Sequence, residues 1–429
     1  MTSKPSVALV ALLAGSAVAL VAPAAAESSP AQLAPAQSSW TLLSLENALT
    51  GGKPTVNLRL RAAAVDRDGF DDKSTALTLR TRLGYNTGVW NGLEIFGEYE
   101  GVAAAGGEAY AGTPAEIASK QRFIIGDPAG NELNQIYLKY SGYGGTAIVG
   151  RQRVIVNNAR MIGNVGWRQN EQTFDGLTLK AKATDALDLE LYYFNKSNFI
   201  FFNTTKLEGS GMLNARYKLG GYGSLAAYGL LYSVEGDGTN NTKTFGLRYE
   251  GSYPLQNRTT DNGLTLATSV EYAQQSDYDD YSSANGDSFS AIYINYDIGL
   301  EMNVGSGRFS ATLGYELLGS DDGDEAVTFP LATNHKFNGW ADIFLFTPDN
   351  GLEDISLALQ AKLAGWTGKL VYHEFSSDEG SIDYGSEIDL VAIRKISARL
   401  TFIAKVAMYN ADQFAADTDR LTFDLNYAF

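Results

Sequence analysis

Polar and apolar residues alternate in short runs through most of this 429-residue chain. Within 288–303, Ile292, Ile294 and Tyr296 share one face, and Tyr293 and Asn295 share the other. Successive side chains of a β-strand point to opposite sides, so this period predicts strands with one apolar and one polar face. We predict about 18 such strands, near residues 55–65, 74–86, 92–101, 133–141, 145–153, 173–183, 186–195, 209–219, 222–234, 242–253, 263–273, 288–303, 308–318, 352–363, 368–376, 384–393, 398–409 and 420–429.

The connections between these runs alternate in length. Short turns such as Gly142–Gly144 and Gly305–Gly307 are interspersed with long polar segments such as 102–132, 154–172 and 319–351. Short turns at one rim and long loops at the other are typical of a transmembrane barrel. The fold class predicted is therefore all-β, a transmembrane antiparallel β-barrel of about 18 strands.

The chain ends on a strand of the same kind. Leu421, Phe423 and Phe429 fall on one face, and Arg420 and Asp424 fall on the other. A closed barrel would pair this last strand on both sides. A terminal Phe in this setting resembles the C-terminal strand of bacterial outer-membrane barrels, which implies the barrel-insertion machinery as a partner.

The first residues predict export. Lys4 precedes an uncharged apolar stretch from Val7 to Ala22, and a small-residue cleavage site precedes Glu27. We predict a signal peptide at 1–26, an N-terminal periplasmic lead at 27–54 and the barrel at 55–429. The expected location is the outer membrane of a Gram-negative bacterium, with outer-membrane lipids and lipopolysaccharide as partners.

Composition narrows the chemistry. The chain has no Cys and a formal charge of −16, which argues against thiolate metal sites and against binding of nucleic acid. We expect no cofactor. The acidic run at Asp66, Asp68 and Asp71 lacks EF-hand spacing, and we interpret it as a solvated outer loop that can bridge divalent cations.

Charged strand faces must point into the lumen, because a charge facing hydrocarbon costs roughly 2–4 kcal/mol at the bilayer midplane. A barrel of about 18 strands leaves space that side chains alone cannot fill, which predicts a water-filled pore. The predicted lumen arginines form three pairs spaced two residues apart, with two further members downstream: Arg59 and Arg61, Arg80 and Arg82, Arg151 and Arg153, then Arg216 and Arg248.

An arginine-lined pore suggests an anionic solute, because the guanidinium is always charged and matches the geometry of a carboxylate. The alternative interpretation is that these arginines pair with lumen acids such as Glu98, Glu100 and Asp175 and hold the barrel in shape. Both interpretations stay open from the sequence.

The connection at 154–172 mixes apolar residues with Arg160 and Arg168. A loop in water would not need that mixture, so we predict that this segment folds inward as a constriction loop.

Several stretches resemble the alginate export family of outer-membrane porins. They are Leu45–Leu49 with Asn57–Arg61, Thr78–Arg82, Gly150–Arg153 with Arg160, Trp167–Glu171 and Thr173–Gly176, and the late stretches Gly319–Gly323, Pro330–Thr333, His335–Asp342 and Thr347–Pro348. The resemblance implies an electropositive conduit for a polyuronate such as alginate. It carries pore roles onto Arg59, Arg61, Arg80, Arg82, Arg151, Arg153, Arg160 and Arg168, with Glu171 and Asp175 as acidic partners. The run Ala62–Ala64 departs from the family pattern.

Two other functions were weighed. A small-solute nutrient porin for organic acids or amino acids fits the same barrel, because a passive pore has no direction of its own. An outer-membrane hydrolase is less favoured, because the two histidines, His335 and His373, lie far apart in sequence beside no nucleophile motif. We therefore expect no enzymatic activity.

Overall fold

The computed structural model describes residues 42–106, 109–255, 263–281 and 288–429. The predicted signal peptide at 1–26 and the first part of the predicted lead lie outside the described residues. Parts of the predicted connections at 102–132, 254–262 and 274–287 do so as well.

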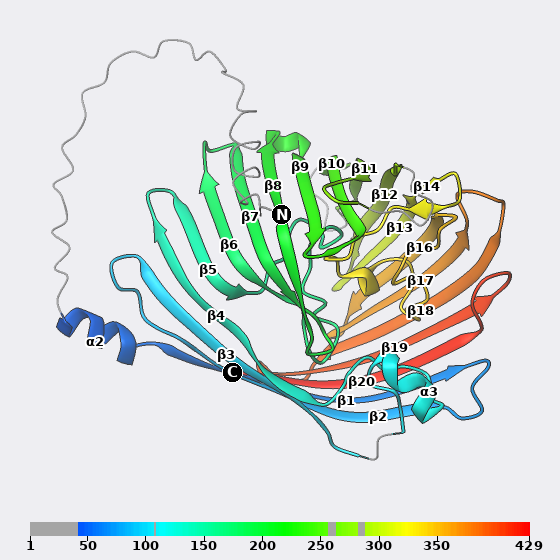
Figure 1. The fold of residues 1–429 in the computed structure, drawn as a ribbon, viewed down its shortest axis with the longest axis horizontal. Helices are drawn as coiled ribbons and strands as arrows, with labels where there is room; N and C mark the ends of the chain where they lie inside the picture. Colours follow the sequence, from blue (N-terminus) through cyan, green and yellow to red (C-terminus); the bar gives the residue numbers. More distant parts are fainter. Residues whose placement is uncertain (1–41, 107–108, 256–262, 282–287) are drawn as a thin grey trace, which may run out of the picture.

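Within the described ranges, 18 strands form one antiparallel sheet that closes on itself (Figure 1). Closure occurs where β1 (Lys53–Arg67) pairs with both β2 (Ser74–Asn86) and β20 (Thr418–Ala428), so the last strand has no free edge. The other wall strands are β3 (Leu93–Ala104), β4 (Gly130–Gly142), β5 (Gly145–Gln152), β6 (Thr173–Lys182), β7 (Leu187–Asn198), β8 (Thr204–Lys218), β9 (Ser224–Val234), β10 (Asp237–Pro254), β11 (Thr265–Asp277), β12 (Ser290–Val304), β13 (Gly307–Leu318), β16 (Leu352–Leu363), β17 (Trp366–Ser376), β18 (Asp383–Lys395) and β19 (Leu400–Ala411).

The predicted barrel and its strand number are confirmed, and the largest boundary differences lie at the starts of β8 and β10. Both strands begin five residues before their predicted starts, at Thr204 and Asp237. Their pairing with β9 shifts register between Leu207 and Gly211 and between Asp237 and Thr242. A register shift breaks the two-residue period, so the regular pattern begins only after the strand has begun.

The two faces of the wall differ as predicted. On β2, Leu79 and Leu83 are exposed on the outer face, whereas Thr78 and Arg80 are buried on the inner face. On the closing strand, Phe423 is exposed and Asp424 is buried. The outer apolar surface suits contact with lipid, and the hydrogen-bonding and charged groups face inward.

Several short helices and two short strands do not form part of the barrel wall. Helix α2 (Leu42–Thr50) precedes β1 and contacts the turn after β2, where Gly88 donates a backbone hydrogen bond to Ala48 at 2.8 Å. The remaining short elements are η1 (Pro114–Glu116), α3 (Ile117–Lys120), η2 (Gly220–Tyr222), β14 (Ser320–Asp321), β15 (Glu325–Ala326) and η3 (Asn334–Lys336). No helix among the described residues is long and apolar enough to cross a membrane.

Two long loops meet inside the barrel. The 153–172 loop folds inward as predicted, and its Gly163 N–H donates to Leu331 of the 319–351 loop at 2.8 Å. Apolar side chains from both loops, including Ile162 and Phe344, share one buried cluster with wall residues such as Tyr293. The expectation of a single constriction loop is therefore incomplete: the 319–351 segment is its second half, because each loop covers apolar surface of the other.

Candidate functional site

The arginines of β1 and β2 face one another across the strand pair. Alternation places Arg59 and Arg61 on the inner face of β1, and Arg80 and Arg82 on the inner face of β2. The register puts Arg59 directly opposite Arg80. Like charges in that position are destabilising, so each guanidinium must find other stabilising contacts.

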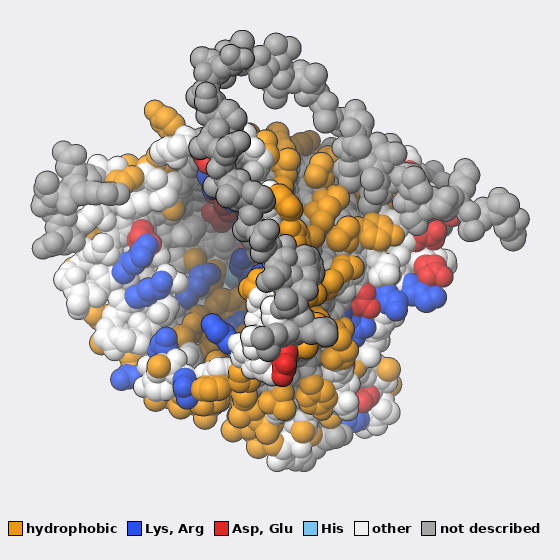
Figure 2. Space-filling model, turned by 90° about the vertical axis from the view of Figure 1, so that its left-hand side faces the viewer, with side chains coloured by type: hydrophobic (Ala, Val, Ile, Leu, Met, Phe, Trp, Pro, Cys, Tyr) orange, Lys and Arg blue, Asp and Glu red, His pale blue; other side chains and the backbone are white. Residues whose placement is uncertain are grey.

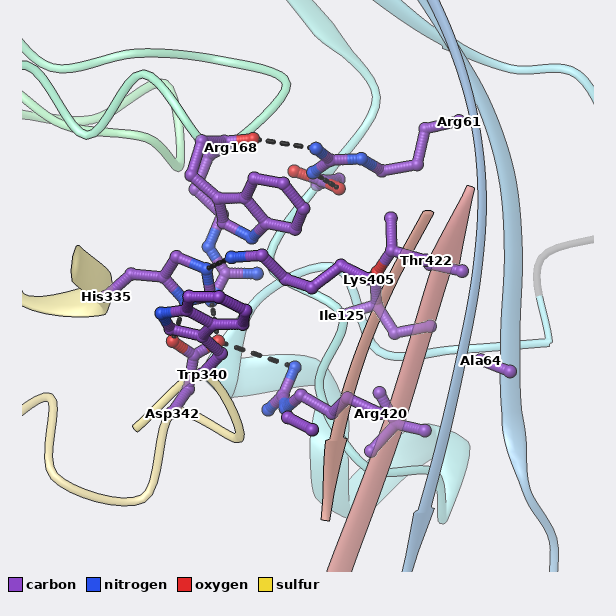
Figure 3. Close-up of a pocket in the computed structure, with 15 residues that line it drawn as sticks. Arg61, Ala64, Ile125, Arg168, His335, Trp340, Asp342, Lys405, Arg420 and Thr422 are labelled. Atoms are coloured by element: carbon purple, nitrogen blue, oxygen red, sulfur yellow. Dashed lines mark hydrogen bonds and ion pairs between the residues drawn. The ribbon is translucent and has the colours of Figure 1, made fainter. Parts of the chain in front are cut away.

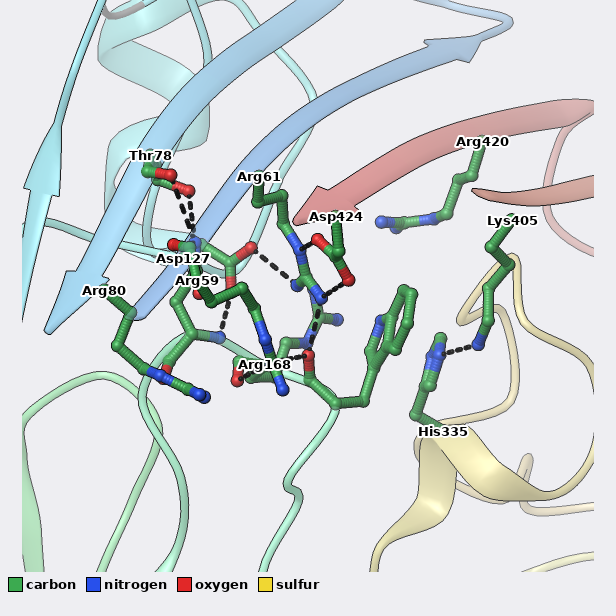
Figure 4. A network of polar contacts seen from close by, with 12 residues as sticks. Arg59, Arg61, Thr78, Arg80, Asp127, Arg168, His335, Lys405, Arg420 and Asp424 are labelled. Carbon is green, nitrogen blue, oxygen red and sulfur yellow. Dashed lines mark hydrogen bonds and ion pairs between the residues drawn. The ribbon is translucent and has the colours of Figure 1, made fainter. Parts of the chain in front are cut away.

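Arg61 joins the wall to two loops (Figure 4). Its guanidinium contacts Asp424 on β20 at 2.8 Å and Asp127 of the 105–129 connection at 3.0 Å, and all three side chains are buried. A further hydrogen bond of 2.8 Å reaches the carbonyl of Trp167 in the constriction loop. Arg61 therefore has its charge matched by two carboxylates and holds the loop against the wall.

Glu171 is a second centre of paired charge. Its carboxylate forms ion pairs with Arg82 at 3.2 Å and with Arg153, and it accepts a hydrogen bond from Asn134 at 2.8 Å. Burial alone would raise the pKa of Glu171, but Arg82 and Arg153 outweigh burial and lower it to about 2. Arg82 also pairs with Glu100. The predicted pairing of Glu171 with lumen arginines is thus present in the geometry.

The remaining paired arginines also contact carboxylates. Arg151 contacts Asp175 at 2.7 Å, Arg160 contacts Glu316 at 2.9 Å, and Arg168 contacts Asp342 at 2.6 Å. Further round the wall, Arg216 contacts Glu250 at 3.2 Å, and Arg248 contacts Glu250 at 2.8 Å and Glu271 at 2.6 Å. Eight of the ten predicted arginines therefore have a carboxylate partner, as the alternative interpretation required.

Arg59 and Arg80 differ from the other eight. Arg59 donates to the Asn426 side chain at 2.7 Å and to the Trp167 and Arg168 carbonyls at 3.0 and 3.1 Å. Arg80 donates to the Asn57 side chain and, at 3.4 Å, to the Gln169 carbonyl. No carboxylate of the described chain lies within ion-pair distance of either residue. Neutral acceptors hold these two guanidiniums in place and leave their charge uncompensated by a direct partner.

An aromatic and basic cluster lies beside this network, and the sequence analysis did not predict it (Figure 3). The ring of His335 stacks on Trp167 with ring centroids 4.9 Å apart. The Lys405 ammonium lies 3.6 Å from the Trp167 ring centroid and 4.1 Å from that of Trp340. These side chains, with Arg61 and Arg168 nearby, surround a cavity of about 20 Å³. The signal in the sequence was the late stretch His335–Asp342, which supplies His335 and Trp340 of this cluster.

His335 links Lys405 to the loop carboxylate. Its Nε2 lies 2.8 Å from the Lys405 ammonium, and its Nδ1 lies 2.5 Å from Asp342. Burial lowers the pKa of His335 to about 3, with Lys405 and Arg168 acting in the same direction against the opposing effect of Asp342. The imidazole is therefore neutral at pH 7, accepting from Lys405 and donating to Asp342. This arrangement fastens the second loop to the β19 wall.

A larger lumen cavity of about 280 Å³ lies on the other side of Trp340, which lines both cavities. It is bounded by β10, β12, β13, β16, β17 and the 334–340 segment. Buried His373 is one lining residue, and its Nδ1 lies 2.9 Å from Asp354.

Figure 2 shows Lys and Arg side chains gathered around a hollow in the left half of the visible face.

Comparisons with known proteins agree with this geometry. Residues 125–323 match the model of the alginate export family. Three similar solved structures are outer-membrane channels: OpdK of Pseudomonas aeruginosa with vanillate (14% identity, 88% of this chain and 98% of that chain, TM-score 0.63), OccAB4 of Acinetobacter baumannii (13%, 88% and 98%, 0.64) and OpdL of P. aeruginosa (16%, 89% and 99%, 0.63).

A comparison with curated proteins finds no match. At identities of 13–16% the likeness to solved structures shows the fold. The family match confirms the predicted resemblance over the segment that contains the 153–172 loop and most of the paired arginines downstream of it. The chain is an outer-membrane β-barrel of the porin type, and its residues 125–323 match the alginate export family.

Proposed function

We propose that the protein is a passive channel for small solutes that carry a carboxylate. The observation that carries this proposal is the opposition of Arg59 and Arg80 without a carboxylate partner among the described residues. Two like charges across neighbouring strands destabilise the wall. A solute that presents negative charge at this level gains from the same field.

Small solutes fit this lumen better than a wide polymer conduit would. The 153–172 and 319–351 loops meet inside the barrel, where they line cavities of about 20 and 280 Å³. A third cavity, of about 590 Å³, is lined by Lys180, Glu190 and Arg216 of the wall. Arg59 is partly exposed, whereas Arg80 is buried, and both contribute through their charge.

The experiment is a reversal-potential measurement on the purified protein in planar bilayers under a KCl gradient. We expect anion selectivity that falls about fivefold in Arg59→Gln, because one unit charge at about 4 Å is worth about 1 kcal/mol in water. Arg59→Lys should keep the selectivity. Lys206→Gln, which removes an exposed cation of β8, is the matched control and should change nothing. Cation selectivity of the unaltered protein would overturn the proposal.

A second candidate function is passage of a polyuronate chain, and the match to the alginate export family over residues 125–323 favours it. Current block by oligouronates of increasing length distinguishes the two. Block that tightens steadily with chain length supports the polymer, because each added residue would contact a further cation. Block that is constant from monomer to hexamer supports the small-solute channel.

A further inference from the structure

The 280 Å³ cavity differs from the arginine network in how its charges are arranged. Three carboxylates line it: Asp297, Glu316 and Asp354. Glu316 has Arg160 as a partner at 2.9 Å, and Asp354 has His373 at 2.9 Å. Asp297 accepts a hydrogen bond from the Ser269 hydroxyl at 2.8 Å, and no cation among the described residues lies within ion-pair distance of it. One lining carboxylate is therefore left without a cation.

Two lining cations are likewise left without a carboxylate in the part of the chain that the structure describes. The Lys336 ammonium donates to the Asn158 carbonyl at 2.7 Å, and its side chain is exposed to the lumen. The Lys369 ammonium lies 5.8 Å from the Trp340 ring centroid. Burial lowers the pKa of Lys336, neighbouring Arg248 and Lys369 lower it further, and Glu250 and Asp297 oppose them. The cavity therefore holds unpaired charges of both signs near one another.

Gly314 lets two polar side chains of the wall come close together beside the cavity. In the register, Asp297 on β12 lies opposite Gly314 on β13, which lies opposite Ser356 on β16. A Cβ at Gly314 would lie 3.0 Å from the Asp297 carboxylate and 2.6 Å from the Ser356 hydroxyl. Any side chain at this position would therefore displace the Asp297 carboxylate from its place at the cavity.

Asn295 supplies an independent sign of a ligand. This residue lines the cavity two positions before Asp297, and its side chain is only 9% exposed. Its Oδ1 has no hydrogen-bond partner in the described structure. A buried acceptor left unpaired is destabilising, and a bound donor group would satisfy it.

We propose that this cavity is a binding site for a zwitterion, a solute whose carboxylate meets Lys336 and Lys369 and whose ammonium meets Asp297 and Asn295. The site presents two cations and one carboxylate at different places. The carboxylate and the ammonium of such a solute can therefore each face a group of opposite charge. An anion without a cationic group would leave Asp297 without a counter-charge. The volume lies near the lower end of the roughly 300–1,000 Å³ typical of small-molecule sites. This inference rests on the proposed passage of small carboxylates and names the class that the second cavity selects.

The test compares three solutes of similar size in liposome swelling: alanine, which carries both charges, lactate, in which a hydroxyl replaces the ammonium, and alaninol, which lacks the carboxylate. We expect the unaltered protein to pass alanine faster than lactate or alaninol. Asp297→Asn should lower the preference for alanine over lactate about tenfold, as loss of one charge-assisted hydrogen bond implies. Gly314→Ala, which keeps every charge, should lower it as well by displacing the Asp297 carboxylate.

Lys336→Gln changes an exposed position, so we expect it to leave folding unaffected. It should slow alanine and lactate together, because both present a carboxylate, and it should leave alaninol unchanged. Lys206→Gln is the control and should leave all three rates unchanged. Equal rates for alanine and lactate in the unaltered protein, or an alanine preference that survives Asp297→Asn, would overturn the zwitterion site while the carboxylate channel stands. Failure of both alanine and lactate to pass would overturn the proposed function itself.

Discussion

The two sides of the lumen use similar residues in different ways. Around β1 to β5, buried arginines and carboxylates contact each other directly, as Arg61 does with Asp424 and Asp127. Around β12 to β17, Asp297 and Lys369 line the same cavity without touching. Direct pairing satisfies the charges and fixes loops to the wall. We propose that the separated charges interact with a solute.

Arg59 and Arg80 are the exceptions on the first side, and we propose that they act on the solute. They lie within the paired network, yet neutral acceptors hold them. The type of a residue and its place on an inner face are the same in both regions. We therefore infer that direct contact with an opposite charge distinguishes a structural charge from a functional one. The predictions below test this distinction with variants whose effects differ in size.

The largest effect is expected from breaking the paired network at Glu171. Glu171→Gln leaves Arg82 with Glu100 and Arg153 with Glu98, so the loss is that of the charge-assisted hydrogen bonds of Glu171, worth roughly 1.5–3 kcal/mol each. Urea unfolding in lipid vesicles, followed by tryptophan fluorescence, measures this change. Asp297→Asn is the matched control from the other side of the lumen, and it should alter stability by less than about 0.5 kcal/mol. Equal effects of the two variants would contradict the distinction between the two regions.

Lowering the pH tests the same network, because it protonates Glu171. The pKa of Glu171 is lowered to about 2, so its stabilising contribution is present above the unfolded value near 4.3 and is lost as the pH falls toward 2. The unaltered protein should lose stability over this range, and Glu171→Gln should lose less of it. The difference between their unfolding curves at pH 6 and pH 3 measures the contribution of this one carboxylate.

A smaller and earlier effect is expected at His335. Its pKa is lowered to about 3, so the unfolded loop binds a proton more readily than the docked loop between about pH 6.5 and pH 3. Docking of the 319–351 loop should weaken as the pH falls through this window, by up to a few kcal/mol at 1.36 kcal/mol per pKa unit. Protonation would turn Nε2 from an acceptor of the Lys405 hydrogen bond into a second donor facing a cation. Arg168 and Arg420, which contact Asp342, add to that repulsion.

Single-channel recordings between pH 7 and pH 4 measure the loop directly. We expect more frequent transitions between conductance levels as the pH falls, and His335→Gln should remove most of the pH dependence above pH 5. Persistence of the full pH response in His335→Gln would assign it to other groups.

The two-residue alternation of polar and apolar residues predicted the strands of the barrel wall, because each strand must present an apolar face to lipid and a polar face to the lumen. It predicted the inner position of Arg59 and Arg80 on the same basis. It did not predict that Arg61 meets Asp127, because residues 66 positions apart become neighbours only when the 105–129 connection folds inward. The alternation also carries no information on which inner charges touch, so Asp297 and Glu316 looked alike in sequence.

The second loop was missed for a related reason. The 319–351 segment contains acidic residues at its start, which favoured an outer position, and its apolar residues Phe329, Leu331 and Phe344 have no regular spacing. These side chains pack irregularly against the first loop and the wall. Trp340 and Lys336 therefore gained their places in the lumen from tertiary contacts that no local pattern encodes.

The smallest effect is expected at Arg216, a predicted pore residue whose pairing is exposed. Arg216 contacts Glu250 at 3.2 Å, with side chains 30% and 40% exposed. Arg216→Gln should change the free energy of unfolding by about 0–1 kcal/mol, because water and salt screen an exposed pair. Urea unfolding at 0.05 and 0.5 M NaCl measures the effect, which should shrink at the higher salt. A loss as large as that of Glu171→Gln would mean that exposure does not separate structural from weak pairs in this lumen. A change in anion selectivity with unaltered stability would instead place Arg216 with Arg59, among the charges that act on the solute.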